Sequence, residues 1–196
     1  KIIGLMKKSF LITMKPKLQK QNNEKPQYVS FLPSANWFLH RKFFNSMGQM
    51  DNRLLRNEDW DFVYRMSKKN FKLFYSPRSV VFHENSTIKH FIKKRYVYGF
   101  HMWPILKQLN PENYYFFLPL FFLLFLLSFP LCYIIDFYFL IYFPILFVYL
   151  TAVLLETLRL CYNVKSFFKM FFVLILANLS PGFGILFGFF DFFKKK

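Results

Sequence analysis

Residues 34 to 84 read SANWFLHRKFFNSMGQMDNRLLRNEDWDFVYRMSKKNFKLFYSPRSVVFHE and contain half of the 10 Asp and Glu residues of this chain. The 196-residue chain carries 27 Lys and Arg, so its formal net charge is +17 and acidic residues are a small minority. Glu58, Asp59 and Asp61 nevertheless fall almost together. A cluster of the minority charge indicates either a structural or a chemical role for these carboxylates.

The local pattern around this acidic cluster predicts a helix. Asn57 is a residue type that often caps a helix N-terminus, and Glu58 and Asp59 would lie in the first turn, where carboxylates interact favourably with the helix dipole. Apolar residues at three- and four-residue spacing extend the helix to about Lys69, and Asn70 ends it. The simplest interpretation of the acids is therefore a capped helix start.

Short apolar runs on either side of this helix predict strands. Residues 28–32 precede it, and residues 72–75 and 79–83 follow it, with a turn signal at Ser76-Pro77 between the last two runs. The last predicted strand ends on His83. This part of the chain is therefore expected to mix helix with strand.

The composition changes sharply near Asn113. Most Lys and Arg residues precede this position, whereas long runs of Phe, Leu, Ile and Tyr follow it. Residues 114–135 and 137–155 are each long and apolar enough to span a bilayer, and Asp136 marks a tight turn between them. The sequence therefore predicts a membrane region after a basic, polar portion.

Residues 167–193 form a third apolar stretch, which Pro181-Gly182 interrupts. Lys and Arg in short loops near a membrane tend to stay cytoplasmic, and basic residues precede the first span and follow the second. The third stretch could span the membrane with a kink or fold back. Because a full crossing would place the basic tail at 194–196 outside, our hypothesis is that it turns back at Pro181-Gly182 and the tail remains cytoplasmic. At the end of the second span, Glu156 and Arg159 are spaced to pair on one helix face.

Residues 88–113 connect the two portions and are rich in Lys and Arg. Apolar residues recur among the basic ones, as in an amphipathic helix that lies in a membrane interface. A basic helix in solvent is an equally consistent interpretation. The positive charge would attract anionic lipid head groups or substrates that carry phosphate.

Two other classes of site are disfavoured by the sequence. Nucleic acid is a common partner of basic chains, but neither a zinc-ligand spacing nor an RNA-recognition motif is present, so no nucleic-acid partner is expected. Cys132 and Cys161 are the only cysteines, and both lie in or beside apolar runs, which indicates neither a disulfide framework nor a metal site.

Several positions between residues 34 and 84 follow one known order: Asn36, Arg41-Lys42, Phe44, Gly48, Asp51, Glu58-Asp59, Asp61, Arg65, Asn70, Tyr75, Pro77, Val81 and His83. This order resembles the second half of a family 2 glycosyltransferase catalytic domain of the GT-A type. The resemblance implies an α/β fold for residues 1–87, as a partial GT-A domain, followed by an all-α membrane region. It also implies that the donor-nucleotide half lies upstream, so the chain is expected to be the C-terminal part of an enzyme and inactive alone.

The resemblance also implies roles for individual residues. Asp59 would be the general base that takes the proton from the acceptor hydroxyl as it attacks the anomeric carbon. A divalent metal, Mg²⁺ or Mn²⁺, would neutralise the donor diphosphate, with its main carboxylate ligands outside this chain and His83 as a possible further ligand. The other candidates are Glu58, Asp61, Asn36 and Trp60 for acceptor contacts or support, and Arg41 and Arg95 for phosphate contacts.

The expected function is therefore sugar transfer, with inversion, from a nucleotide-sugar donor to a saccharide or polyprenyl-linked acceptor in the synthesis of a cell-surface polysaccharide or glycolipid. The enzyme would sit in a lipid bilayer, such as a bacterial inner membrane, with its catalytic portion in the cytoplasm. Two alternatives remain open: a basic, membrane-anchored protein without catalysis, and an inactive remnant of such an enzyme.

Overall fold

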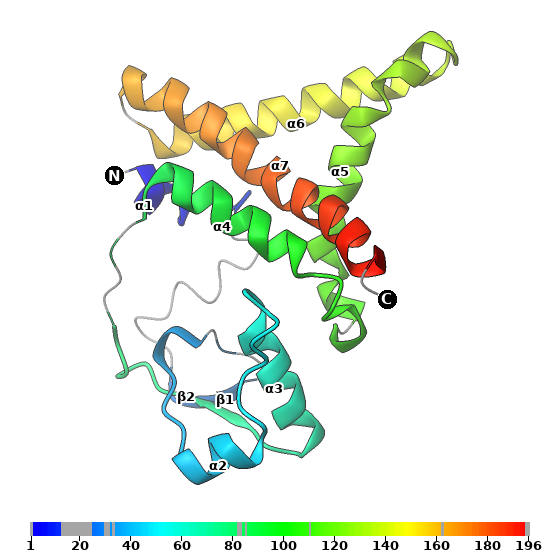
Figure 1. The fold of residues 1–196 in the computed structure, drawn as a ribbon. Helices are drawn as coiled ribbons and strands as arrows, with labels where there is room; N and C mark the ends of the chain where they lie inside the picture. Colours follow the sequence, from blue (N-terminus) through cyan, green and yellow to red (C-terminus); the bar gives the residue numbers. More distant parts are fainter. Residues whose placement is uncertain are drawn as a thin grey trace.

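The computed structural model describes residues 2–12, 25–29, 32, 34–81, 84, 86–109, 111–161 and 163–194. Most of these residues are helical, and the elements form two parts (Figure 1). A small part contains the two strands with the helices α2 and α3, and a larger part contains the long helices α4 to α7 together with α1. The change in composition near residue 113 therefore does not coincide with the boundary between the parts, because α4 already belongs to the helical one.

The small part has a two-stranded antiparallel sheet in which β1 (Gln27–Val29) pairs with β2 (Leu73–Tyr75). The short helix η3 (Ser34–Asn36) and the helix α2 (Arg41–Ser46) follow β1, and α3 (Glu58–Lys68) precedes β2. Apolar residues of α3 form the centre of its core, because a helix with an apolar stripe buries that stripe against its neighbours. The buried residues are Met47, Phe62, Val63, Met66 and Leu73.

The predicted helix is confirmed, and the predicted strands are confirmed in part. Asn70 has a φ of 60°, a left-handed conformation that Asn tolerates, and this ends the path of α3. The strand expected at 28–32 is β1, and the strand expected at 72–75 is β2. Residues 79–81 form no strand, and residues 82 and 83 lie outside the described residues.

The helical part is arranged around α7 (Val164–Lys194), which lies between α6 (Tyr138–Leu160) and α4 (Ile88–Phe100) and is crossed by α5 (Leu118–Leu127) (Figure 1). Among the residues that the structure describes, three segments are long and apolar enough to cross a membrane: Tyr114–Tyr133, Tyr138–Leu160 and Val164–Lys194. Short helical turns complete this part, namely η4 (Leu106–Gln108), η5 (Pro111–Phe117) and η6 (Phe129–Tyr133).

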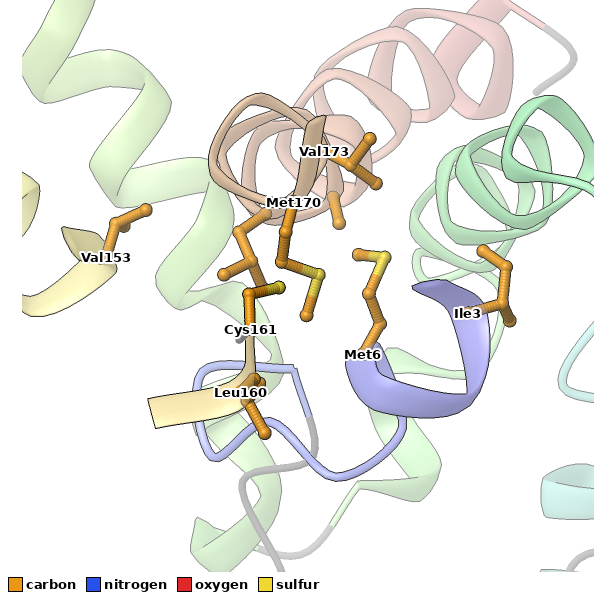
Figure 2. Packing of buried hydrophobic residues seen from close by; sticks show 9 residues of the cluster. Ile3, Met6, Val153, Leu160, Cys161, Met170 and Val173 are labelled. Atoms are coloured by element: carbon orange, nitrogen blue, oxygen red, sulfur yellow. The ribbon is translucent and has the colours of Figure 1, made fainter. Parts of the chain in front are cut away.

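The N-terminal helix α1 (Ile2–Met6) belongs to this helical part. Ile3 and Met6 are buried among residues of α6 and α7, including Val153, Met170 and Val173 (Figure 2). The predicted pair at the end of α6 is confirmed, since Arg159 Nε lies 2.7 Å from Glu156 Oε2. The same pair holds the turn after α1. Glu156 Oε1 accepts the backbone N–H of Phe10 at 2.7 Å, and Arg159 donates to the carbonyl of Lys8 at 3.1 Å.

The expectation that the third apolar stretch turns back at Pro181 is wrong, because α7 continues through this proline as one helix of 31 residues. Proline lacks an N–H, so Pro181 leaves the carbonyl of Ala177 without its usual donor four residues later. Nε of Arg95 in α4 donates to that carbonyl at 2.6 Å. A neighbouring helix therefore supplies the missing hydrogen bond, which is how membrane helices commonly tolerate proline.

Helices α4 and α7 run side by side in the same direction and approach closely (Figure 1). Glycine makes this approach possible: a Cβ on Gly184 would lie 2.1 Å from the Tyr96 carbonyl oxygen, and one on Gly99 would lie 2.2 Å from the Pro181 carbonyl oxygen. Ser180 also donates to the Ile92 carbonyl at 2.8 Å. Small residues that allow helix backbones to touch are typical of packing between membrane helices. One side of α4 therefore packs against α7.

The predicted all-α region is confirmed, but an α/β GT-A fold is not shown. The described residues contain a single two-stranded sheet, and its strands are three residues each. Packing of α3 against this sheet agrees with a mixed α/β unit, whereas a parallel, nucleotide-binding sheet is not present in the described part of the chain.

Candidate functional site

The first turn of α3 carries the acidic cluster and holds Asp59 in a defined orientation. Asp59 is half-buried, and its two carboxylate oxygens accept hydrogen bonds from different backbone groups. The N–H of Ser34 in η3 donates to Oδ2 at 3.3 Å, and the N–H of Trp60 donates to Oδ1 at 2.9 Å. A helix N-terminus also favours negative charge. The carboxylate is therefore fixed from two directions rather than free to rotate.

Asn57 occupies the N-cap position of α3, as predicted, and its carbonyl accepts the N–H of Asp61 at 3.1 Å, but its side chain does not cap the helix. Its φ of 66° is left-handed, and its side chain makes no capping hydrogen bond to α3. Nδ2 of Asn57 instead donates to the backbone carbonyls of Tyr98, at 3.2 Å, and His101, at 3.1 Å. These carbonyls lie at the C-terminal end of α4, where helix carbonyls lack partners within the helix. The left-handed backbone directs the amide away from its own helix, so Asn57 caps a different one.

Asp61 is buried, with 8% of its surface exposed, and both of its carboxylate oxygens have partners. Arg65 Nε lies 2.9 Å from Oδ2, one helical turn away. Gln108 Nε2 donates to Oδ1 at 2.8 Å from the membrane-proximal turn η4. Arg65 also donates to the backbone carbonyls of Met47 and Gln49. Asp61 and Arg65 together therefore link α3 to η4 and to the segment at Met47 and Gln49.

The remaining predicted acceptor-side residues have separate environments. One carboxylate oxygen of Glu58, Oε2, is buried and has no hydrogen-bond partner among the residues that the structure describes. The indole of Trp60 packs edge to face on Phe116, with 5.9 Å between ring centroids. Nδ2 of Asn36 donates to the Ser79 carbonyl at 3.0 Å, so it fixes the loop after β2 and makes no hydrogen bond to Asp59. Glu58 is thus the member of this group with an unused acceptor.

The two predicted phosphate contacts are not brought together. Arg41 is exposed at the start of α2. Arg95 lies in the interface between α4 and α7, where burial lowers the pKa of its guanidinium to about 10 and its Nε bonds the Ala177 carbonyl. Neither arginine forms an ion pair with Glu58, Asp59 or Asp61 within the described ranges.

No metal site can be built from the described residues. His83, the predicted ligand, lies outside them. Within residues 2–12, 25–29, 32, 34–81, 84, 86–109, 111–161 and 163–194, no group of three or more His, Cys, Asp and Glu side chains is placed to hold an ion. The described residues therefore supply no complete metal site of their own, and the divalent metal, with its main ligands expected outside this chain, stays a prediction.

Two residues near the acidic cluster were not predicted from the sequence. Gln108 contacts Asp61 across a separation of 47 residues. Tyr98 lies near Arg56 and Lys94, whose charged groups are each 5.7 Å from the centre of its ring. Burial, and then the negative charge of Asp59, raise the pKa of the Tyr98 hydroxyl. No sequence pattern marks either residue, because their positions depend on how α4 docks against α3.

An open cavity of about 430 Å³ adjoins the buried end of this site. Asp61 and Arg65 line it together with a loop whose Asp51 and Arg53 are paired at 2.7 Å. Asp59 is not among its lining residues, so the cavity lies beside Asp61 rather than at the candidate base. The complete lining is Gly48, Met50, Asp51, Asn52, Arg53, Asp61 and Arg65.

Comparison with known proteins gives one match. The family model described as "Glycosyl transferase family group 2" matches residues 16–179, which include the whole of α3, α4, α5 and α6 and the first half of α7. Neither the curated proteins nor the solved structures compared with the chain gave a match. The match covers the acidic cluster and the apolar segments together, so both parts of the structure fall within one family.

Proposed function

Because this chain belongs to glycosyl transferase family group 2, we propose that it serves sugar transfer from a nucleotide-sugar donor to a saccharide or lipid-linked acceptor, with Asp59 as the general base. Family membership supports a transferase and implies a donor and an acceptor. The three apolar segments support a membrane setting. The observation that carries the assignment to Asp59 is its orientation by the backbone of Ser34 and of Trp60 at a helix start.

The proposed chemistry is a single displacement. The acceptor oxygen attacks the anomeric carbon and forms the new glycosidic bond while the bond from that carbon to the donor diphosphate breaks, and the diphosphate leaves with the electron pair. Asp59 takes the acceptor proton as the oxygen bonds, which requires the carboxylate within hydrogen-bond reach of the hydroxyl. Attack from the face opposite the leaving group inverts the configuration.

The neighbouring residues divide into two kinds. Glu58 remains the candidate for an acceptor contact, because its Oε2 has no hydrogen-bond partner among the described residues. Asp61 is better suited to a structural role, since Arg65 and Gln108 occupy both of its oxygens. Trp60 and Asn36 also hold segments in place through their contacts with Phe116 and the Ser79 carbonyl.

The position of α4 supports a membrane-bound location for the candidate base. Helix α4 connects the acidic cluster to the apolar helices, so the candidate base lies next to the membrane-proximal segment. A lipid-linked acceptor could then reach Asp59 from the bilayer surface. We propose that this side is cytoplasmic, where nucleotide sugars are available, and that the membrane is the inner membrane of a bacterium.

Asp59→Asn in the full-length protein tests the assignment. The amide keeps the size and an acceptor oxygen but cannot take a proton, so transfer should fall by about 10²- to 10⁴-fold while donor affinity stays nearly unchanged. Transfer rate and donor affinity are measured for both proteins. Asp136→Asn, in the turn between α5 and α6, is the matched control and should transfer normally. Near-normal turnover by Asp59→Asn would exclude Asp59 as the base.

A further inference from the structure

Side-chain hydrogen bonds attach the first turn of α3 to the membrane-proximal segment at two points, beside the packing of Trp60 on Phe116. On one side, Asn57 Nδ2 donates to the carbonyls of Tyr98 and His101 at the end of α4. On the other side, Gln108 Nε2 donates to Asp61 Oδ1 at 2.8 Å. Asn57 immediately precedes α3, and Asp61 lies in its first turn. Glu58, Asp59 and Trp60 therefore lie between the two attached residues in the sequence.

The first attachment joins two helix ends of opposite polarity. The C-terminal end of a helix carries partial negative charge and the N-terminal end partial positive charge, so the end of α4 and the start of α3 attract one another. Asn57 satisfies carbonyls that α4 cannot satisfy itself. This contact fixes where α3 begins, but a single junction leaves the helix free to turn about it.

The second attachment, together with the packing of Trp60 on Phe116, restrains that rotation. Asp61 is one turn along α3 from Asn57, and it is buried. Its Oδ2 is paired with Arg65 of its own helix, so Oδ1 is the oxygen that reaches across to the membrane-proximal segment. A hydrogen bond to a charged group is stronger than one between neutral groups. Gln108 therefore acts with the Trp60–Phe116 contact to set the rotation of α3 relative to η4.

We propose that Gln108 is a positioning residue for Asp59. Through Asp61 it fixes the first turn of α3 against the end of α4 and η4, so that the Asp59 carboxylate faces an acceptor presented at the membrane surface. The inference rests on the proposed function of Asp59. Gln108 lies 49 positions beyond Asp59 in the sequence and touches neither the substrate nor Asp59, so it acts on catalysis through Asp61.

Two variants of Gln108 distinguish the loss of its hydrogen bond to Asp61 from the mere replacement of the glutamine side chain. Gln108→Met has nearly the same length but no N–H donor, whereas Gln108→Lys keeps a donor at similar reach. Lys107→Met changes the exposed neighbour and is the control. Hydrogen exchange of the amides in residues 58–64, measured on the full chain in lipid nanodiscs, should accelerate on the order of tenfold in Gln108→Met, the factor expected for losing a hydrogen bond to a charged group. Gln108→Lys and Lys107→Met should stay near the natural rate.

Kinetics on the full-length protein supply the second measurement. Gln108→Met should lower kcat on the order of tenfold with the donor KM unchanged, because the base is misplaced while the donor site is intact, and Gln108→Lys should restore most of the rate. Unchanged exchange in Gln108→Met, or equal effects of Met and Lys, would overturn the proposal. If exchange responds as expected but the natural protein transfers no sugar, the proposed function fails and the catalytic role of Gln108 fails with it.

Discussion

Replacing Arg95 with Met should destabilise the packing of α4 on α7 more strongly while Pro181 is present than after Pro181→Ala. Pro181 lacks an N–H, so the Ala177 carbonyl depends on Arg95 Nε, which lies 2.6 Å away. Without the guanidinium this carbonyl, inside a helix interface, loses its donor. An unsatisfied buried acceptor costs about 1–3 kcal/mol, and Arg95→Met should lower the free energy of unfolding by that amount.

Pro181→Ala supplies the missing donor from within α7, because alanine at this position has an N–H that can bond the Ala177 carbonyl. In that background Arg95→Met leaves no carbonyl unsatisfied, so its cost should be smaller by about 1–2 kcal/mol, within the range observed for residues that share a partner. The difference between the two costs measures the coupling between Arg95 and Pro181, independently of what each change does alone.

The assay is unfolding of the full chain from mixed micelles by SDS, followed by far-ultraviolet circular dichroism, for the natural protein, both single variants and the double variant. Lys93→Met removes an exposed charge two positions before Arg95 in α4 and should change stability by less than about 0.5 kcal/mol. If Arg95→Met costs the same in both backgrounds within about 0.5 kcal/mol, the two residues are independent and the reasoning is refuted. Arg95 would then again be a candidate phosphate contact.

Two further predictions concern the loop beside the cavity and the membrane topology. The hydrogen bond from Arg53 lowers the pKa of the Asp51 carboxyl from 3.8 to about 2, so the pair stabilises the fold above pH 4 and loses this effect as the pH falls towards 2. Arg53→Gln should therefore lower the denaturation midpoint slightly at pH 7 and hardly at all near pH 2; an equal effect at both would contradict this. If α6 spans the membrane, single cysteines that replace Asp136 and Lys165 in a cysteine-free background should react with labelling reagents added on opposite sides. Reaction of both cysteines from the same side would contradict that topology.

The sequence by itself determined the elements whose signals are local. The helix after Asn57 follows from apolar spacing over three turns, and its end follows from Asn70, which adopts a left-handed backbone. The three apolar segments follow from length and composition alone, because a bilayer demands about 20 apolar residues in a row. The resemblance to family 2 glycosyltransferases also rested on residue order, and the family match confirms it.

Only the tertiary structure decided how these elements meet. Asn57 is the N-cap residue of α3, as the sequence predicted, yet its side chain bonds the end of α4. Which helix the side chain reaches depends on where the second helix ends. Pro181-Gly182 is a dipeptide typical of turns, yet α7 continues through it. Arg95 supplies the hydrogen bond that proline loses, and Gly182 and its neighbours allow close packing. Gln108 carries no signal at all. Its role comes from a hydrogen bond across 47 residues, and such contacts are set by the docking of helices, which no local pattern of side chains encodes.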